Sequence, residues 1–192
     1  RKDEDKKSWI KLTNFYGIEI KSFPSEIARL ALLIAEFQCN VRHIGQREAC
    51  LDVLPLHDTG RIAANNALRL DWAEVCPIRI PTGTVEEDLG GPTGRLALEG
   101  LALSETFICG NPPFKGARKQ SPEQKADMDL VFGGGNDYKD CDYVISWYLK
   151  AAEYARKSGD CDFAFVSTNS ISRGEQVQRL APRLDDGDAE AG

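Results

Sequence analysis

The feature that most constrains this chain of 192 residues is an alternation of short strand-like segments with amphipathic helical segments. Residues 13–20 (TNFYGIEI) are rich in β-branched and aromatic side chains, as strands are. Residues 22–38 follow with apolar side chains at the helical period, and Pro24 suits the first turn of such a helix. Alternating strands and helices are typical of parallel sheets. The pattern therefore predicts an α/β fold with a doubly wound, mainly parallel sheet.

The alternation continues in the rest of the chain. We expect strands near residues 63–70, 106–109 and 162–167, and a helix over residues 142–157. Residues 77–104 are rich in Gly and Pro and are expected to form a long loop or a flap with a hairpin. A polar, basic stretch follows the third strand to about Lys139. In doubly wound sheets ligands bind at the carboxyl ends of strands, where Glu19, Asp71 and Asn111 fall.

Charge and hydropathy limit the class of protein. The chain has 24 basic and 30 acidic residues, a net charge of −6, which excludes a strongly basic nucleic-acid module. It contains no run of 18 apolar residues, and its charged beginning (RKDEDKKSW) does not resemble a secretory signal. We expect a cytoplasmic domain over residues 1–180 and an acidic, flexible tail over residues 181–192. The only methionine is Met128, so we expect the chain to be part of something larger.

The six cysteines are scattered and form no Cys-x-x-Cys pair. His43 and His57 are isolated in polar surroundings and are expected at the surface. Free thiols in a reducing compartment are therefore the prediction, and no metal site is expected.

The sequence Asn111-Pro112-Pro113-Phe114 follows an apolar strand. Each proline ring fixes φ and pushes the preceding residue out of the helical region, so the tetrapeptide is stiff. The Asn111 amide and the Pro112 carbonyl then point in fixed directions and suit an NH₂ group with two hydrogens to donate. Phe114 offers a flat face for stacking. A rigid turn whose asparagine satisfies its own backbone is the alternative from the residues alone.

The sequence GNPPF after an apolar strand resembles the catalytic motif of S-adenosylmethionine-dependent methyltransferases that modify amino groups, especially adenine-N6 DNA methyltransferases. Neighbouring segments are similar to the methylase region of large bacterial enzymes that combine restriction and modification in one chain. They are NFYGIEI with PSEIARLALLIAEFQ, NALRLDW, NPPFKGARKQSPEQKADMDLVF, DYVISWYLKAAEYA and FAFVSTNSISRGEQV, together spanning residues 13–178. The resemblance implies a Rossmann-like class I methyltransferase fold.

The resemblance implies cofactor-binding roles for four residues. Glu19 would bind both ribose hydroxyls of S-adenosylmethionine, since a carboxylate accepts two hydroxyl protons. Ile20 would pack on the cofactor's adenine. Asp71 would accept its amino hydrogens, with Trp72 beside it as backbone donor or wall. Taken singly, Glu19 also fits a solvated strand end and Asp71 a helix cap.

The resemblance also implies a mechanism and a partner. Asn111 and the Pro112 carbonyl would accept the hydrogens of a flipped adenine amine in double-stranded DNA while Phe114 stacks on the base. Residues 111–126 carry one acid, Glu123, and four bases that could meet the phosphate backbone: Lys115, Arg118, Lys119 and Lys125. A solvated loop is the other interpretation of that stretch.

The family has a glycine-rich cofactor loop after its first strand, and the 12 residues before Thr13 contain no glycine. We therefore expect a sheet truncated at its first strand, a chain inactive on its own, and self-association through the exposed sheet edge. Three functions stay open. They are adenine-N6 methylation of DNA, methylation of guanine-N2 in RNA or of a protein glutamine by a related motif, and a remnant without catalysis. The basic stretch and Ser167–Ser170 favour DNA.

Overall fold

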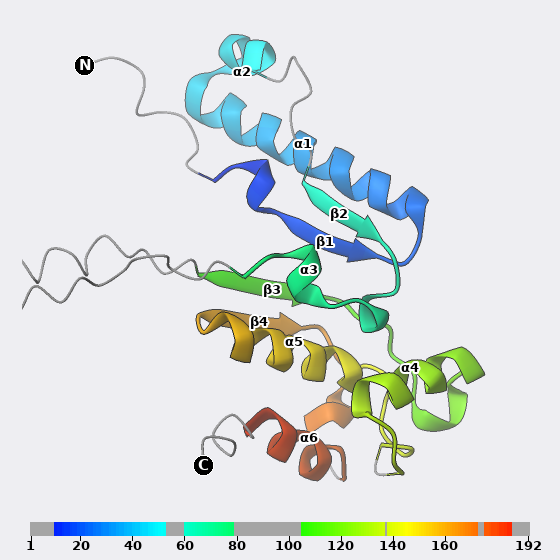
Figure 1. The fold of residues 1–192 in the computed structure, drawn as a ribbon. Helices are drawn as coiled ribbons and strands as arrows, with labels where there is room; N and C mark the ends of the chain where they lie inside the picture. The colour runs from blue at the N-terminus through cyan, green and yellow to red at the C-terminus, as the bar shows by residue number, and fades with distance from the viewer. Residues whose placement is uncertain (1–9, 53–59, 79–104, 137, 173–174, 186–192) are drawn as a thin grey trace, which may run out of the picture. The chain divides into compact units, whose positions relative to one another are not determined.

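The computed structural model describes residues 10–52, 60–78, 105–136, 138–172 and 175–185 (Figure 1). The chain divides into two compact units, Arg1–Cys76 and Pro77–Gly192. Each unit contains a two-stranded parallel sheet and helices.

The first unit is built on two parallel strands joined by helices (Figure 1). Its elements are η2 (Leu12–Asn14), β1 (Tyr16–Glu19), α1 (Ser22–Ile44), α2 (Gln46–Asp52), β2 (Arg61–Ala64), η3 (Ala67–Arg69) and α3 (Trp72–Val75). Tyr16 pairs with Arg61 and Glu19 with Ala64. Gly17 lets the strands pack closely, because a Cβ there would lie 2.8 Å from Ile62 Cδ1. The predicted strand over residues 13–20 and the helix after it are confirmed.

The second predicted strand of this unit was placed wrongly. The expectation was a strand near residues 63–70 that delivers Asp71 at its end, whereas β2 stops at Ala64. The Asn66 side chain accepts a hydrogen bond from Leu68 N at 3.0 Å and starts η3. Asparagine side chains compete in this way with strand pairing, which ends the strand early. Asp71 therefore follows a turn rather than a strand.

The second unit repeats the plan of parallel strands joined by helices. Its elements are β3 (Thr106–Gly110), η4 (Ala117–Lys119), α4 (Pro122–Phe132), α5 (Ile145–Ser158), β4 (Cys161–Phe165), η5 (Asn169–Ser172) and α6 (Glu175–Asp185). β3 and β4 run parallel, in register from Thr106 with Cys161 to Gly110 with Phe165. Tyr148 of α5 meets the rings of Phe163 and Phe165 edge-on. The predicted strands at 106–109 and 162–167 and the helix between them are confirmed.

Helix α4 falls in the stretch for which the sequence predicts only a polar, basic character. Ser121 and Gln124 form a capping box with Pro122 at the first turn, and Gly133 ends the helix at a φ of 72°. The helix buries Met128 and Phe132, and Phe132 stacks on Tyr138 with ring centroids 4.6 Å apart. Among the described residues, Met128 and Phe132 are the large apolar side chains that this helix buries. Two such residues are too few to show a helical period in the sequence.

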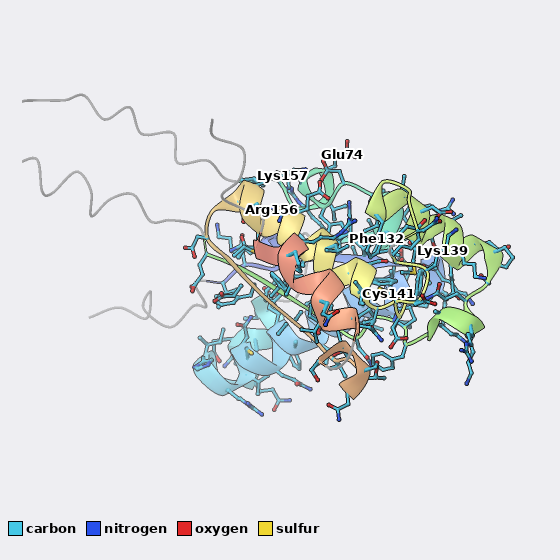
Figure 2. The ribbon with its side chains drawn as sticks, turned by 90° about the horizontal axis from the view of Figure 1, so that it is seen from below. Glu74, Phe132, Lys139, Cys141, Arg156 and Lys157 are labelled. Carbon is cyan, nitrogen blue, oxygen red and sulfur yellow. The ribbon has the colours of Figure 1, made fainter. Side chains whose placement is uncertain are left out.

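Helix α5 forms the centre of the second unit's core. Ile145, Leu149, Ala152 and Tyr154 are buried on it. The polar side chains Arg156 and Lys157 lie at its C-terminal end (Figure 2). The apolar face that the sequence predicts for this helix is buried at Val144, Ala151 and Ala152 and half-buried at Tyr148 and Ala155.

The described residues support the α/β class and the parallel pairing, while the doubly wound arrangement of one sheet stays a prediction. Most of the predicted flap at 77–104 lies outside the described residues. Of the segment assigned to an acidic tail, residues 181–185 belong to α6 and residues 186–192 lie outside them. None of the helices in the described residues combines the length and apolar character needed to cross a bilayer.

Candidate active site

The motif loop, residues 111–120, begins directly after β3. Pro112 is buried, whereas Asn111 is exposed and Phe114 exposes 42% of its surface. In the part of the chain that the structure describes, the Asn111 side chain makes no hydrogen bond, so it does not satisfy its own backbone. The asparagine is therefore presented to solvent from a buried proline anchor.

The loop after β4 lies beside the start of the motif loop. Because β3 and β4 are parallel and Gly110 pairs with Phe165, their carboxyl ends are neighbours. Val166 N donates a hydrogen bond to the Gly110 carbonyl at 3.0 Å. Asn111 thus leaves its strand next to the segment that contains Ser167–Ser170.

A turn at residues 141–143 holds the far end of the motif loop. Tyr143 N donates to the Lys115 carbonyl at 2.8 Å. The Gln120 amide donates to the Lys115 and Cys141 carbonyls, at 3.3 and 2.9 Å. Both ends of the loop are therefore fixed by the second unit's own backbone.

Asp142 joins this turn to the loop after β4. Its Oδ2 accepts a hydrogen bond from Ser170 Oγ at 2.5 Å, and Ser170 Oγ lies 2.6 Å from Thr168 Oγ1. A Cβ added at Gly116 would stand 3.4 Å from Asp142 Oδ1, so the motif loop passes close to this carboxylate. Asp142 was not singled out from the sequence, because no local pattern marks an acid that meets residues 28 positions away.

The predicted phosphate-contacting residues come from three consecutive elements. Lys115 lies in the motif loop, Arg118 and Lys119 in η4, and Lys125 in α4, and all four are exposed. The stretch is thus an ordered segment with a helix, and the solvated-loop interpretation fails for α4. The Ser121 hydroxyl hydrogen-bonds the carboxylate of the opposing acid, Glu123, and lowers its pKa.

The predicted cofactor residues belong to the first unit. Glu19 is half-buried at the end of β1, where its carbonyl accepts from Asn65 N at 2.7 Å. Ile20 follows at once and exposes 70% of its surface. An acid at a strand end with an exposed aliphatic neighbour is the arrangement that the sequence predicts.

Asp71 takes the position of a helix cap. Its Oδ1 accepts from Ala73 N at 2.9 Å at the start of α3. The Trp72 indole donates to the Ala67 carbonyl, also at 2.9 Å, and so ties α3 to η3. The interpretation of Asp71 as a helix cap is therefore confirmed, and its role in cofactor binding stays a prediction.

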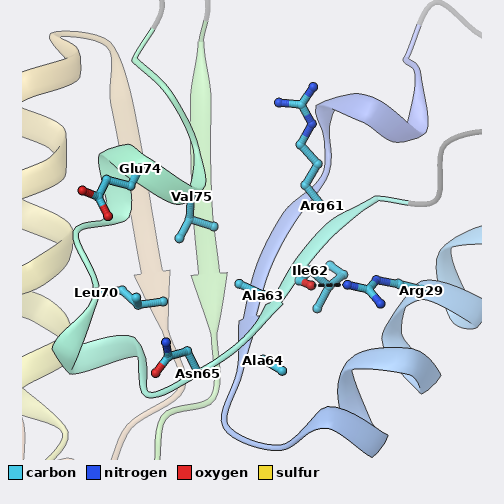
Figure 3. Close-up of a pocket in the computed structure, with 9 residues that line it drawn as sticks. All are labelled: Arg29, Arg61, Ile62, Ala63, Ala64, Asn65, Leu70, Glu74 and Val75. Atoms are coloured by element: carbon cyan, nitrogen blue, oxygen red, sulfur yellow. Dashed lines mark hydrogen bonds between the residues drawn. The ribbon is translucent and has the colours of Figure 1, made fainter.

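A cavity of about 360 Å³ in the first unit lies along β2, between Arg29 and the Leu70–Val75 segment (Figure 3). Its lining contains none of the four predicted cofactor residues. Among the described residues there is no cluster of three or more His, Cys, Asp or Glu side chains placed to hold a metal ion.

Comparisons with known proteins identify the family. Residues 1–190 match the family model of the MmeI DNA-methyltransferase domain. The chain is 37% identical over 172 residues to DNA methyltransferase A of Bacillus subtilis (strain 168), an alignment that covers 89% of this chain and 17% of that protein.

A solved structure agrees with the family match. It is that of the type IIL restriction–modification enzyme MmeI in complex with DNA, at 36% identity and a TM-score of 0.68 over 91% of this chain and 20% of that chain. The chain thus spans a fifth or less of these relatives. These matches confirm the resemblance to the methylase region of combined restriction–modification enzymes. The chain belongs to the family of the MmeI DNA-methyltransferase domain.

Proposed function

We propose that the full-length protein transfers a methyl group from S-adenosylmethionine to the N6 amine of adenine in double-stranded DNA, and that the motif loop is its catalytic centre. The observation that carries the proposal is the presentation of Asn111. Its exposed amide stands on a loop fixed at both ends, beside the loop after β4. A catalytic group needs a fixed direction and an open approach, and this loop supports both.

The motif loop would act through two acceptors. Asn111 Oδ1 and the Pro112 carbonyl would each accept one hydrogen of the exocyclic amine and favour a pyramidal nitrogen with a directed lone pair. Positive charge develops on that nitrogen as the new bond forms, so fixed acceptors stabilise the transition state more than the ground state. Phe114, partly exposed next to them, would stack on the flipped base.

The residues of the first unit fit S-adenosylmethionine. The cofactor supplies an electrophilic methyl group when it is bound. Glu19 would accept the ribose hydroxyls and Ile20 would cover the adenine with its exposed side chain. A carboxylate has about four acceptor sites, so Asp71 could cap α3 through Oδ1 and still accept an amine hydrogen. Trp72 would serve as wall or backbone donor, because its indole N–H is engaged with Ala67.

The DNA backbone would meet the basic segment that follows the motif. Lys115, Arg118, Lys119 and Lys125 are exposed over a short stretch of chain. Phosphate neutralisation by such side chains positions DNA without reading its sequence. The helical order of α4 gives Lys125 a defined place relative to η4, which supports a binding surface.

The test is Asn111→Ala in the full-length protein. The variant should lose about 10²–10³-fold or more in methyl transfer, because a positioned acceptor is removed. Cofactor affinity, measured by calorimetry, should stay nearly unchanged. Asn136→Ala changes another exposed asparagine of the same unit and is the matched control. An Asn111→Ala protein with full activity would refute the assignment.

The substrate is tested by offering duplex DNA, RNA and protein in parallel, with nucleoside and peptide mass spectrometry of the products. N6-methyladenine in DNA is the expected product. N2-methylguanine in RNA or methylglutamine in protein would replace the proposal with the related-motif alternatives. No product from any substrate, with cofactor binding intact, would indicate a non-catalytic protein.

A further inference from the structure

The long helix of the first unit has two different faces. α1 has 23 residues and is about 35 Å long. On its sheet side Ser25 is buried, and the Arg29 guanidinium donates to the Ile62 carbonyl of β2 at 2.6 Å (Figure 3). The side that faces the sheet is thus partly polar and already satisfied.

The opposite face carries a continuous apolar row, here called the α1 seam. Its residues recur at alternating steps of four and three positions: Phe23, Ile27, Leu30, Ile34, Phe37 and Val41. The first four expose 74%, 49%, 52% and 48% of their surface, and the last two are half-buried. Single exposed apolar residues are ordinary, whereas an unbroken row along a helix marks an interaction surface.

The spacing of the α1 seam indicates what kind of partner fits it. Steps of four and three are the a and d positions of a heptad, a narrow stripe that packs on another helix rather than on a sheet. The positions that flank the seam carry one charge, on Glu26; the others are Pro24, Ala31, Leu33, Gln38 and Asn40. The contact between the α1 seam and its partner helix would therefore consist mainly of apolar side-chain packing. Few ion pairs would contribute to the choice of partner.

We propose that the α1 seam docks a second amphipathic helix that belongs to the same full-length polypeptide, outside the 192 residues of this sequence. The family relatives place this unit in chains of which it makes up 17% and 20%. A helix on the same chain is available at an effective concentration of about millimolar. A second copy would have to bring its helix at its concentration in solution, without that advantage.

A matched pair of substitutions in the full-length protein tests the α1 seam. Ile34→Asp places a charge in the seam, and Ala35→Asp places the same charge on the neighbouring exposed residue outside it. If a helix covers the seam, Ile34→Asp lowers the melting temperature by several degrees and Ala35→Asp leaves it unchanged. Equal effects of the two substitutions would show that the seam is solvated and overturn the proposal.

If Ile34→Asp does not fold, chemical labelling of a cysteine variant tests the proposal instead. Ile34→Cys should react with a maleimide about tenfold more slowly than the native Cys39, which is exposed about 140° further around the same helix. Peptide mass spectrometry reads the two sites separately, and sedimentation gives the oligomeric state. Equal labelling of a monomer contradicts the proposal. Protection of the Ile34→Cys thiol that appears only in a dimer would assign the α1 seam to contact with a second copy. That outcome also contradicts the proposal.

Discussion

Both units pair two parallel strands and cover them with a helix, yet they differ in how much they bury. Among the described residues, the first unit's buried apolar side chains are Leu12, Ala49, Ile62 and Leu68. The described part of the second unit buries a larger set: Met128, Phe132, Tyr138, Cys141, Tyr143, Val144, Ile145, Leu149, Ala151, Ala152 and Tyr154. The motif loop is thus supported by the core of its own unit. In the first unit, by contrast, a large apolar row, the α1 seam, is not part of the core.

The difference teaches which properties each unit controls by itself. Positioning of Asn111 depends on local contacts, such as Tyr143 N with the Lys115 carbonyl. The long helix beside the predicted cofactor residues has an apolar face that its own unit does not use. We therefore expect substitutions in the second unit to act on stability directly. Substitutions in the first unit should act more on binding and on contacts with other parts of the protein.

The largest effect on stability is expected from a matched pair of isoleucines. Ile145→Ala removes a side chain that is 1% exposed and should lower the free energy of unfolding by about 2–4 kcal/mol. Ile20→Ala removes one that is 70% exposed and should cost about 0.5 kcal/mol or less. Denaturant unfolding of the full-length variants measures both. Similar losses of unfolding free energy in the two variants would contradict the difference in burial between the units.

A smaller effect is expected from the buried hydrogen bond between α4 and the turn before α5. Tyr143 Oη donates to Asp127 Oδ2 at 2.7 Å, and both residues are buried. Tyr143→Phe deprives that carboxylate of a donor and should cost about 1–3 kcal/mol. The control is Tyr148→Phe, whose hydroxyl makes only long contacts of 3.3 Å and should cost less. An unchanged free energy of unfolding in Tyr143→Phe would show that this hydrogen bond does not stabilise the core.

Asp71 allows capping and binding to be separated in the first unit. Asp71→Ser keeps a cap for Ala73 N and should leave stability unchanged, whereas Asp71→Ala should lose about 1 kcal/mol. Both variants remove the carboxylate, so both should weaken S-adenosylmethionine about tenfold if it accepts an amine hydrogen. Calorimetry measures the affinity. Wild-type affinity in Asp71→Ser would leave Asp71 with its structural role alone.

The smallest effect concerns pH. The pKa of Glu123 lies below its ordinary value, first because of the Ser121 hydroxyl and then because of its own backbone N–H. The charged form is therefore favoured in the folded state. Its contribution to stability is present above the unfolded pKa and is lost as the pH falls through the lower, folded pKa. NMR titration of labelled glutamate should show the pKa of Glu123 rising in Ser121→Ala. An unchanged value would assign the shift to the backbone.

The sequence predicted elements that have a strong period and missed those that depend on polar capping. Val144, Tyr148, Ala151 and Ala155 recur at the helical period, which predicts α5. Helix α4 begins with a capping box at Ser121 and Gln124, but its exposed surface is polar, so the sequence predicts only a polar, basic stretch there. The end of β2 depends on one asparagine side chain, which a propensity scale does not weigh.

The candidate site was predictable where one short motif carries it and unpredictable where distant residues support it. Asn111 to Phe114 stood out because two prolines follow a strand. Asp142 and Ser170 meet across 28 positions, and only the folded chain brings the turn at residues 141–143 to the loop after β4. Local periodicity contains no such information.

The two prolines of the motif loop have a consequence for what the loop rejects. Pro112 and Pro113 lack backbone N–H groups, so the main chain there presents carbonyl oxygens and no donors. Such a surface offers a keto oxygen no backbone donor, whereas an amine could donate a hydrogen bond to it. A base that offers a carbonyl at the corresponding position, as thymine and guanine do, would meet the partial negative charge of the Pro112 carbonyl with no backbone hydrogen between them. The loop would therefore discriminate between bases by exclusion as much as by recognition.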